Sequence, residues 1–142
     1  MFFLAAALIG LIAAIPVIMW SRHQASAVLV KAAGWGLVVA ASVYFFASLN
    51  RADGLWKIIE LMGIGLYGCF YWMARKQPLK ALAWGWGLHP VWDIFLHWLG
   101  PGSYIMPAWY AIACAVFDGL VALYLWWRHT QEPQRLSYWV NE

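Results

Sequence analysis

Apolar residues gather in five stretches of the chain, each close to the roughly 20 residues that a helix needs to cross a membrane. These stretches cover residues 2–20, 27–49, 54–73, 81–99 and 105–127. Polar segments and turns containing glycine or proline separate them. The pattern predicts an all-α fold in which residues 1–142 form one bundle of five transmembrane helices, ending in a short polar tail at 128–142.

The composition excludes a soluble protein. Of the 142 residues, 65% are hydrophobic and 11% are charged, whereas about 25% of residues in soluble domains are charged. The net charge of +3 comes from basic residues at the ends of the apolar stretches. We therefore predict the lipid bilayer as a partner and no binding to nucleic acid. Many of the 12 tryptophans lie near the same ends, as expected for an aromatic belt.

The distribution of Lys and Arg predicts the orientation. With five crossings, Arg51 and Lys57 lie on one side and seven basic residues on the other. These seven are Arg22, Lys31, Arg75, Lys76, Lys80, Arg128 and Arg135. Because cytoplasmic segments are enriched in Lys and Arg, we expect a cytoplasmic C-terminus and an external N-terminus. The predicted location is a bacterial cytoplasmic membrane, crossed several times.

Three ionisable residues, His89, Asp93 and His97, recur at every fourth position within the fourth apolar stretch. On a helix each four-residue step rotates by only about 40°, so the three side chains form one stripe. An unpaired polar group at this depth costs a few kcal/mol. Pro90 also removes a backbone donor and favours a kink beside a polar pocket. The stripe therefore predicts a buried polar site.

A second stripe, with the same spacing, consists of Tyr110, Cys114 and Asp118 in the fifth stretch. Because only the turn at 100–106 separates the two stretches, their helices are expected to be antiparallel neighbours. Along the sequence, depth in the membrane then changes in opposite directions in the two stripes. His89 and Asp118 are the pair that we expect most firmly.

The shallower residues are expected to pair in the same way. Depth places His97 beside Tyr110 and Asp93 beside Cys114 or Glu60, the last from the third stretch. Glu60 has a second interpretation, because it lies three residues after Lys57 and the two can form a helix ion pair.

Imidazole and carboxylate ligands suit a divalent metal such as zinc or iron. The candidate ligands are His89, Asp93, His97, Glu60 and Asp118. His89 and His97 lie about 12 Å apart along a helix, so one ion takes Asp93 with only one of them, plus a carboxylate from another helix. Two other interpretations stay open: a proton relay or ligand site without metal, and a hydrogen-bonded network that fixes helix packing.

The run from His89 to His97, followed by the one from Pro107 to Asp118, resembles small bacterial integral membrane proteins of unassigned function. The resemblance covers the fourth and fifth stretches only. It implies no established activity.

We expect a polar centre that binds or transforms a lipophilic small molecule reached through the outer leaflet. His89, Asp93 and Asp118 are the candidate catalytic residues of an acid–base or metal-dependent enzyme. The expected pocket residues are Trp86, Trp92, Tyr110 and Cys114. The alternatives are a proton-coupled carrier or proton pathway, and a structural subunit of a larger membrane complex. The carrier interpretation also predicts a homo-oligomer, because 142 residues are few for a monomeric carrier.

Overall fold

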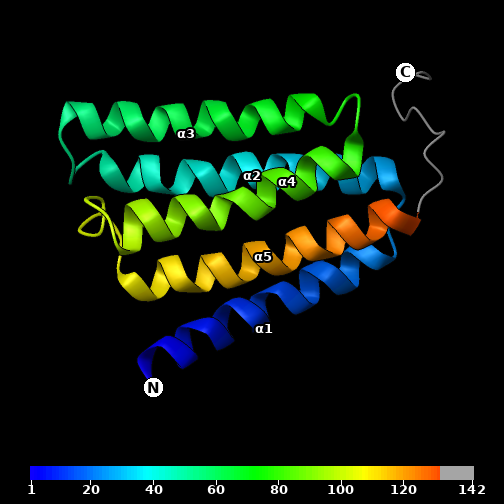
Figure 1. Ribbon diagram of the computed structural model, residues 1–142, viewed down its shortest axis with the longest axis horizontal. Coiled ribbons are helices and arrows are strands. Elements are labelled where there is room, and N and C mark those ends of the chain that lie inside the picture. Colours follow the sequence, from blue (N-terminus) through cyan, green and yellow to red (C-terminus); the bar gives the residue numbers. More distant parts are fainter. Residues whose placement is uncertain (132–142) are drawn as a thin grey trace.

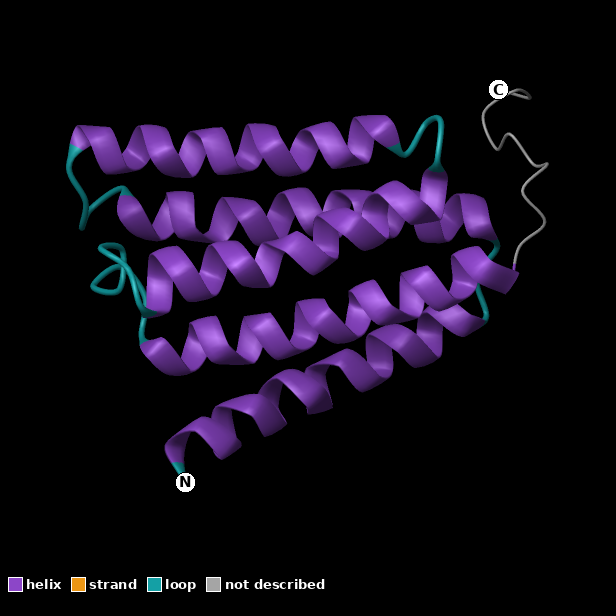
Figure 2. Cartoon of the chain, viewed as in Figure 1, coloured by secondary structure: helices purple, strands orange, loops and turns teal. Residues whose placement is uncertain are grey.

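The computed structural model describes residues 1–131, and the regular elements in this part of the chain are all helices (Figures 1 and 2). These are α1 (Phe2–Arg22), α2 (Ser26–Ser48), α3 (Gly54–Met73), α4 (Pro78–Trp92), the π-helix η1 (Asp93–Trp98) and α5 (Ala108–Gln131). The predicted all-α fold is confirmed within this range. Most of the predicted polar tail, including Arg135, lies outside the described residues.

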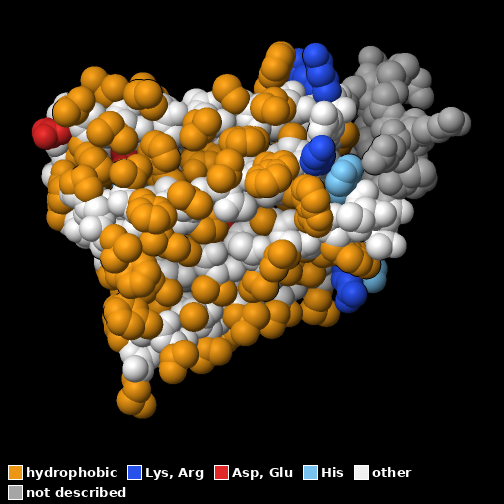
Figure 3. Space-filling model, viewed as in Figure 1, with side chains coloured by type: hydrophobic (Ala, Val, Ile, Leu, Met, Phe, Trp, Pro, Cys, Tyr) orange, Lys and Arg blue, Asp and Glu red, His pale blue; other side chains and the backbone are white. Residues whose placement is uncertain are grey.

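Three helices, α1, α2 and α5, are long and apolar enough to cross a membrane. The others are α3, which carries Lys57 and Glu60, and α4, which has only 15 residues. Apolar side chains cover the surface between the two ends of the molecule (Figure 3). Leu4 is 72% exposed and Leu123 is 68% exposed. Such a surface is suited to lipid rather than to water.

Successive helices run in alternating directions, but chain neighbours are not always packing neighbours (Figure 1). α5 packs between α1 and α4, while α4 also contacts α2 and α3, and α2 packs against α3. Close approach depends on small residues. A Cβ atom built on Gly10 of α1 would lie 2.2 Å from the carbonyl oxygen of Ala113 in α5.

The fourth apolar stretch is not one continuous α-helix, which corrects the expectation of a single span at 81–99. α4 begins at Pro78, ends at Trp92 and continues as η1. The Leu99 amide donates to the Ile94 carbonyl at 2.9 Å, a five-residue step typical of a π-helix. Pro90 has no amide hydrogen to donate just before this change. The π-helix alters the direction of His97 relative to Asp93.

Positive charge is concentrated at one end of the bundle. The described basic residues at this end are Arg22, Lys31, Arg75, Lys76, Lys80 and Arg128. Figure 3 shows blue side chains at this end of the visible face. Arg51 and Lys57 belong to the opposite end, near the α2–α3 connection. We call the first end the basic end.

Candidate metal centre

Three polar side chains meet in the interior at the junction of α4, η1 and α5. His89 Nδ1 lies 2.8 Å from Asp118 Oδ2, where the two residues form a hydrogen bond, and 3.6 Å from Asp93 Oδ2. Each residue is at most 2% exposed. We call these residues the His89 triad. The meeting of His89 with Asp118 is the arrangement that helix depth predicts.

The His89 triad has the geometry of a site for one metal ion. One ligand atom from each residue lies within 4.8 Å of the other two. In a tetrahedral zinc site with bonds of about 2.0–2.1 Å, neighbouring ligand atoms lie about 3.3 Å apart. The distances of 2.8 and 3.6 Å bracket that value. The triad could therefore hold a divalent ion in place of the His89–Asp118 hydrogen bond.

Unpaired atoms accompany this geometry. Within the described residues, both Asp93 carboxylate oxygens and His89 Nε2 are buried without a hydrogen-bond partner. Buried polar atoms are usually paired, so each exception requires an explanation. Two carboxylates beside one imidazole also carry a net negative charge even when the imidazole is protonated. A divalent cation bound to the two carboxylates and a neutral His89 would cancel that charge.

A second pair of ionisable side chains is buried separately. Glu60 Oε1 of α3 lies 3.2 Å from His97 Nε2 of η1, although the angles are not those of a hydrogen bond. Tyr44 stacks on the His97 ring at a centroid distance of 3.6 Å, and Trp56 approaches it edge-on at 6.3 Å. We call Glu60 and His97 the Glu60–His97 pair.

This arrangement differs from the expected ladder. Glu60 lies beside His97 rather than beside Asp93, and its ion-pair partner is not Lys57. His97 stacks on Tyr44 instead of pairing with Tyr110. The five candidate metal ligands therefore divide into a group of three and a group of two.

Tyr110 and Cys114 share one face of α5 with Asp118, since the three recur at every fourth position. Cys114 lies one helical turn after Tyr110 on α5 and one turn before Asp118. The Tyr110 ring meets the Tyr44 ring edge-on at a centroid distance of 6.0 Å. Neither residue is among the three converging ligands of the His89 triad.

Sequence reasoning missed two tyrosines as site residues. The Tyr67 ring lies 4.6 Å from the His89 ring, and its hydroxyl donates to the Leu88 carbonyl at 3.3 Å. Tyr44, which is 1% exposed, covers His97. Their positions in the sequence could have identified them, because helix depth places Tyr67 level with His89 and Tyr44 near the same end as His97.

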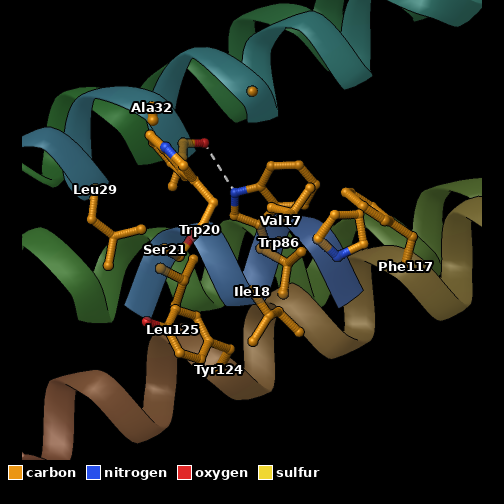
Figure 4. A pocket seen from close by; sticks show the side chains of 14 residues that line it. Val17, Ile18, Trp20, Ser21, Leu29, Ala32, Trp86, Phe117, Tyr124 and Leu125 are labelled. Carbon is orange, nitrogen blue, oxygen red and sulfur yellow. Dashed lines mark hydrogen bonds between the residues drawn. The ribbon is translucent and has the colours of Figure 1, made fainter. Parts of the chain in front are cut away.

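An apolar cavity of about 450 Å³ lies among α1, α2, α4 and α5 (Figure 4). Trp86 forms part of its wall, and the indole Nε1–H donates to the Ala33 carbonyl at 3.0 Å. Of the expected pocket residues, only Trp86 lines it. Trp92 instead packs against α3, where a Cβ atom on Gly63 would lie 2.8 Å from the Trp92 ring. Tyr110 and Cys114 do not line it either.

Two residues that line the cavity are close in sequence to the His89 triad, but His89, Asp93 and Asp118 do not themselves line it. Trp86 precedes His89 by one helical turn, and Phe117 immediately precedes Asp118. The Trp86 and Phe117 rings lie 5.9 Å apart, in an edge-on arrangement, and both line the cavity.

The chain matches no protein-family model, no curated protein and no solved structure. The resemblance of the segments around His89 and Asp118 to small membrane proteins stays a prediction. The residues themselves define a helical protein whose buried His and Asp side chains could hold a metal ion.

Proposed function

We propose that the protein is a multi-pass membrane protein whose five helical segments all cross a bacterial cytoplasmic membrane. α4 and η1 together supply 15 and 6 residues, enough for one crossing of about 20 residues. The basic end faces the cytoplasm, which places the N-terminus outside and the C-terminus inside. The alternating helix directions support this arrangement.

Within this bundle, the His89 triad binds one divalent metal ion, zinc or iron. The single observation that carries this proposal is the convergence of three fully buried ligand atoms within 4.8 Å of one another. Three protein ligands leave a coordination position for water or substrate, as in catalytic zinc sites. A metal ion in such a position polarises a bound carbonyl or activates a bound water.

The molecule on which this centre acts is lipophilic. The cavity at Trp86 supports this, because its walls are almost wholly apolar and its volume of about 450 Å³ is in the range of small-molecule sites. Its lining comes from the C-terminal part of α1 and the N-terminal part of α2, both near the basic end. The cavity therefore favours entry from the leaflet at the basic end rather than from the outer leaflet.

Metal analysis of the purified protein tests the centre. We expect about one zinc or iron ion per chain, and a loss of at least about 90% of it in His89→Ala and in Asp93→Ala, because each removes one of three ligands. Glu60→Gln is the matched control and keeps the metal, because Glu60 belongs to the other buried group. Absence of metal at stoichiometric supply, or binding unchanged by both alanine variants, refutes the centre.

A proton pathway, as in a proton-coupled carrier, is the second candidate. It is favoured by Asp93, whose two carboxylate oxygens are buried without a hydrogen-bond partner. Asp93 belongs to the His89 triad and lies four residues before His97, so its position in the sequence is between the two buried groups. In that case Asp93→Asn or Asp118→Asn abolishes pH-dependent flux in liposomes while the helices persist. An accessory subunit of a membrane complex would show neither metal nor flux and would tolerate paired hydrophobic replacements.

A further inference from the structure

A groove between α3 and α4, which no residue of the His89 triad lines, combines positive charge with exposed indole rings. Its volume is about 280 Å³. Its lining includes Trp72, Arg75, Lys76, Gln77, Lys80 and Trp84, together with apolar residues. Three of the lining residues are cations, and none is a carboxylate. The groove is therefore suited to an anion.

The start of α4 adds to this preference. Gln77 occupies the cap position but makes no side-chain hydrogen bond to the helix, and the first turn contains no acidic residue. Free amide groups at a helix N-terminus attract anions. Lys80, which lines the groove, supplies such a first-turn amide, whereas Pro78 has none to supply. Side-chain and backbone charge thus act in the same direction.

The other half of the groove is apolar and faces outward. Trp72 is 62% exposed and Trp84 is 53% exposed. Tryptophan is enriched at the level of lipid headgroups, where its ring contacts chains and its N–H contacts polar groups. Figure 3 shows the boundary between apolar surface and basic side chains at this end. The groove lies where a headgroup meets its acyl chains.

We propose that this groove binds the phosphate of an anionic phospholipid, whose acyl chains lie along α3 and α4. Arg75, Lys76 and Lys80 hold the phosphate, and Trp72 and Trp84 flank the glycerol region. Basic pockets between membrane helices on the cytoplasmic side bind anionic headgroups in this way. Neither the metal centre nor its activity is needed for this binding.

Native mass spectrometry of the full chain tests the site, using equal amounts of phosphatidylglycerol and phosphatidylcholine in detergent. We expect one retained phosphatidylglycerol, preferred at least about tenfold over phosphatidylcholine, since each basic residue adds to the attraction. The combined variant Arg75→Gln, Lys76→Gln, Lys80→Gln loses this preference. The matched variant Arg22→Gln, Lys31→Gln, Arg128→Gln removes three charges from the same end and keeps it.

Two results would overturn the proposal. Equal losses in both triple variants show a diffuse surface charge rather than a site. Displacement of the lipid by inorganic phosphate at equal concentration shows a site for a soluble anion. Two single variants test the role of the groove tryptophans. Trp72→Ala weakens lipid retention about threefold or more, whereas Trp35→Ala, on α2 and with the same 62% exposure, does not. Circular dichroism verifies that each variant keeps its helices.

Discussion

The His89 triad and the Glu60–His97 pair contain the same side-chain types in equally dry surroundings, yet they differ in charge. One imidazole beside one carboxylate can form a neutral ion pair. One imidazole beside two carboxylates cannot, so the His89 triad needs a further proton or a cation. The comparison teaches that the ratio of carboxylate to imidazole, rather than burial, distinguishes the two groups. A candidate metal centre has an excess of carboxylate, whereas a pair whose charges cancel without a cation is self-sufficient.

Breaking the Glu60–His97 pair tests its self-sufficiency and should have the largest effect. His97→Ala leaves Glu60 buried beside an uncompensated space, so we expect the free energy of unfolding to fall by about 3–5 kcal/mol. Unfolding in mixed detergent micelles measures it. Replacing both residues, as Glu60→Leu with His97→Leu, should recover most of the loss. If the double variant is as unstable as the single one, the pair is not self-sufficient.

Adding zinc should stabilise the protein through the His89 triad and not through the Glu60–His97 pair. Zinc at about 100 times its dissociation constant should raise the free energy of unfolding by about 2.7 kcal/mol, because it binds the folded state. Asp118→Asn should abolish this increase, and Glu60→Gln should leave it intact. Unfolding curves with zinc and with a chelator provide the measurement. An increase that survives Asp118→Asn would assign the metal to another site.

The contact between Gly63 of α3 and the Trp92 ring, next to Asp93, should be sensitive to added volume. A methyl group at Gly63 would meet the Trp92 ring at 2.8 Å, and such overpacking costs about 1–3 kcal/mol. Gly63→Ala should therefore lower the free energy of unfolding. Gly65→Ala is the control on the same helix, since a Cβ atom there meets nothing within 4 Å. That variant should be neutral or slightly stabilising because alanine favours helix.

The smallest effect is expected at the tyrosine beside the His89 triad. Tyr67→Phe keeps the ring that contacts His89 and removes only the hydroxyl that donates to the Leu88 carbonyl. The expected loss is about 0.5–1.5 kcal/mol of unfolding free energy, with unchanged zinc stoichiometry. A loss of zinc in this variant would place the hydroxyl, and not only the ring, in the metal site.

Depth along a helix was a sound guide to one part of the site. It placed His89 opposite Asp118, because the short connection between η1 and α5 makes these segments antiparallel neighbours. Its prediction of Glu60 beside Asp93 was wrong, because Glu60 lies beside His97. The partner of that residue depends on how α3 is rotated against η1, and no local pattern in the sequence determines this rotation.

The sequence by itself determined the helical segments, the accumulation of basic residues at one end and the presence of polar groups at depth. These properties follow from hydropathy and helical period, which are local. Only the tertiary structure decided the π-helical turn at Asp93, the division of five candidate ligands into the His89 triad and the Glu60–His97 pair, and the packing of α1 on α5. Each of these depends on which helix faces meet, and contacts between residues distant in the chain select those faces.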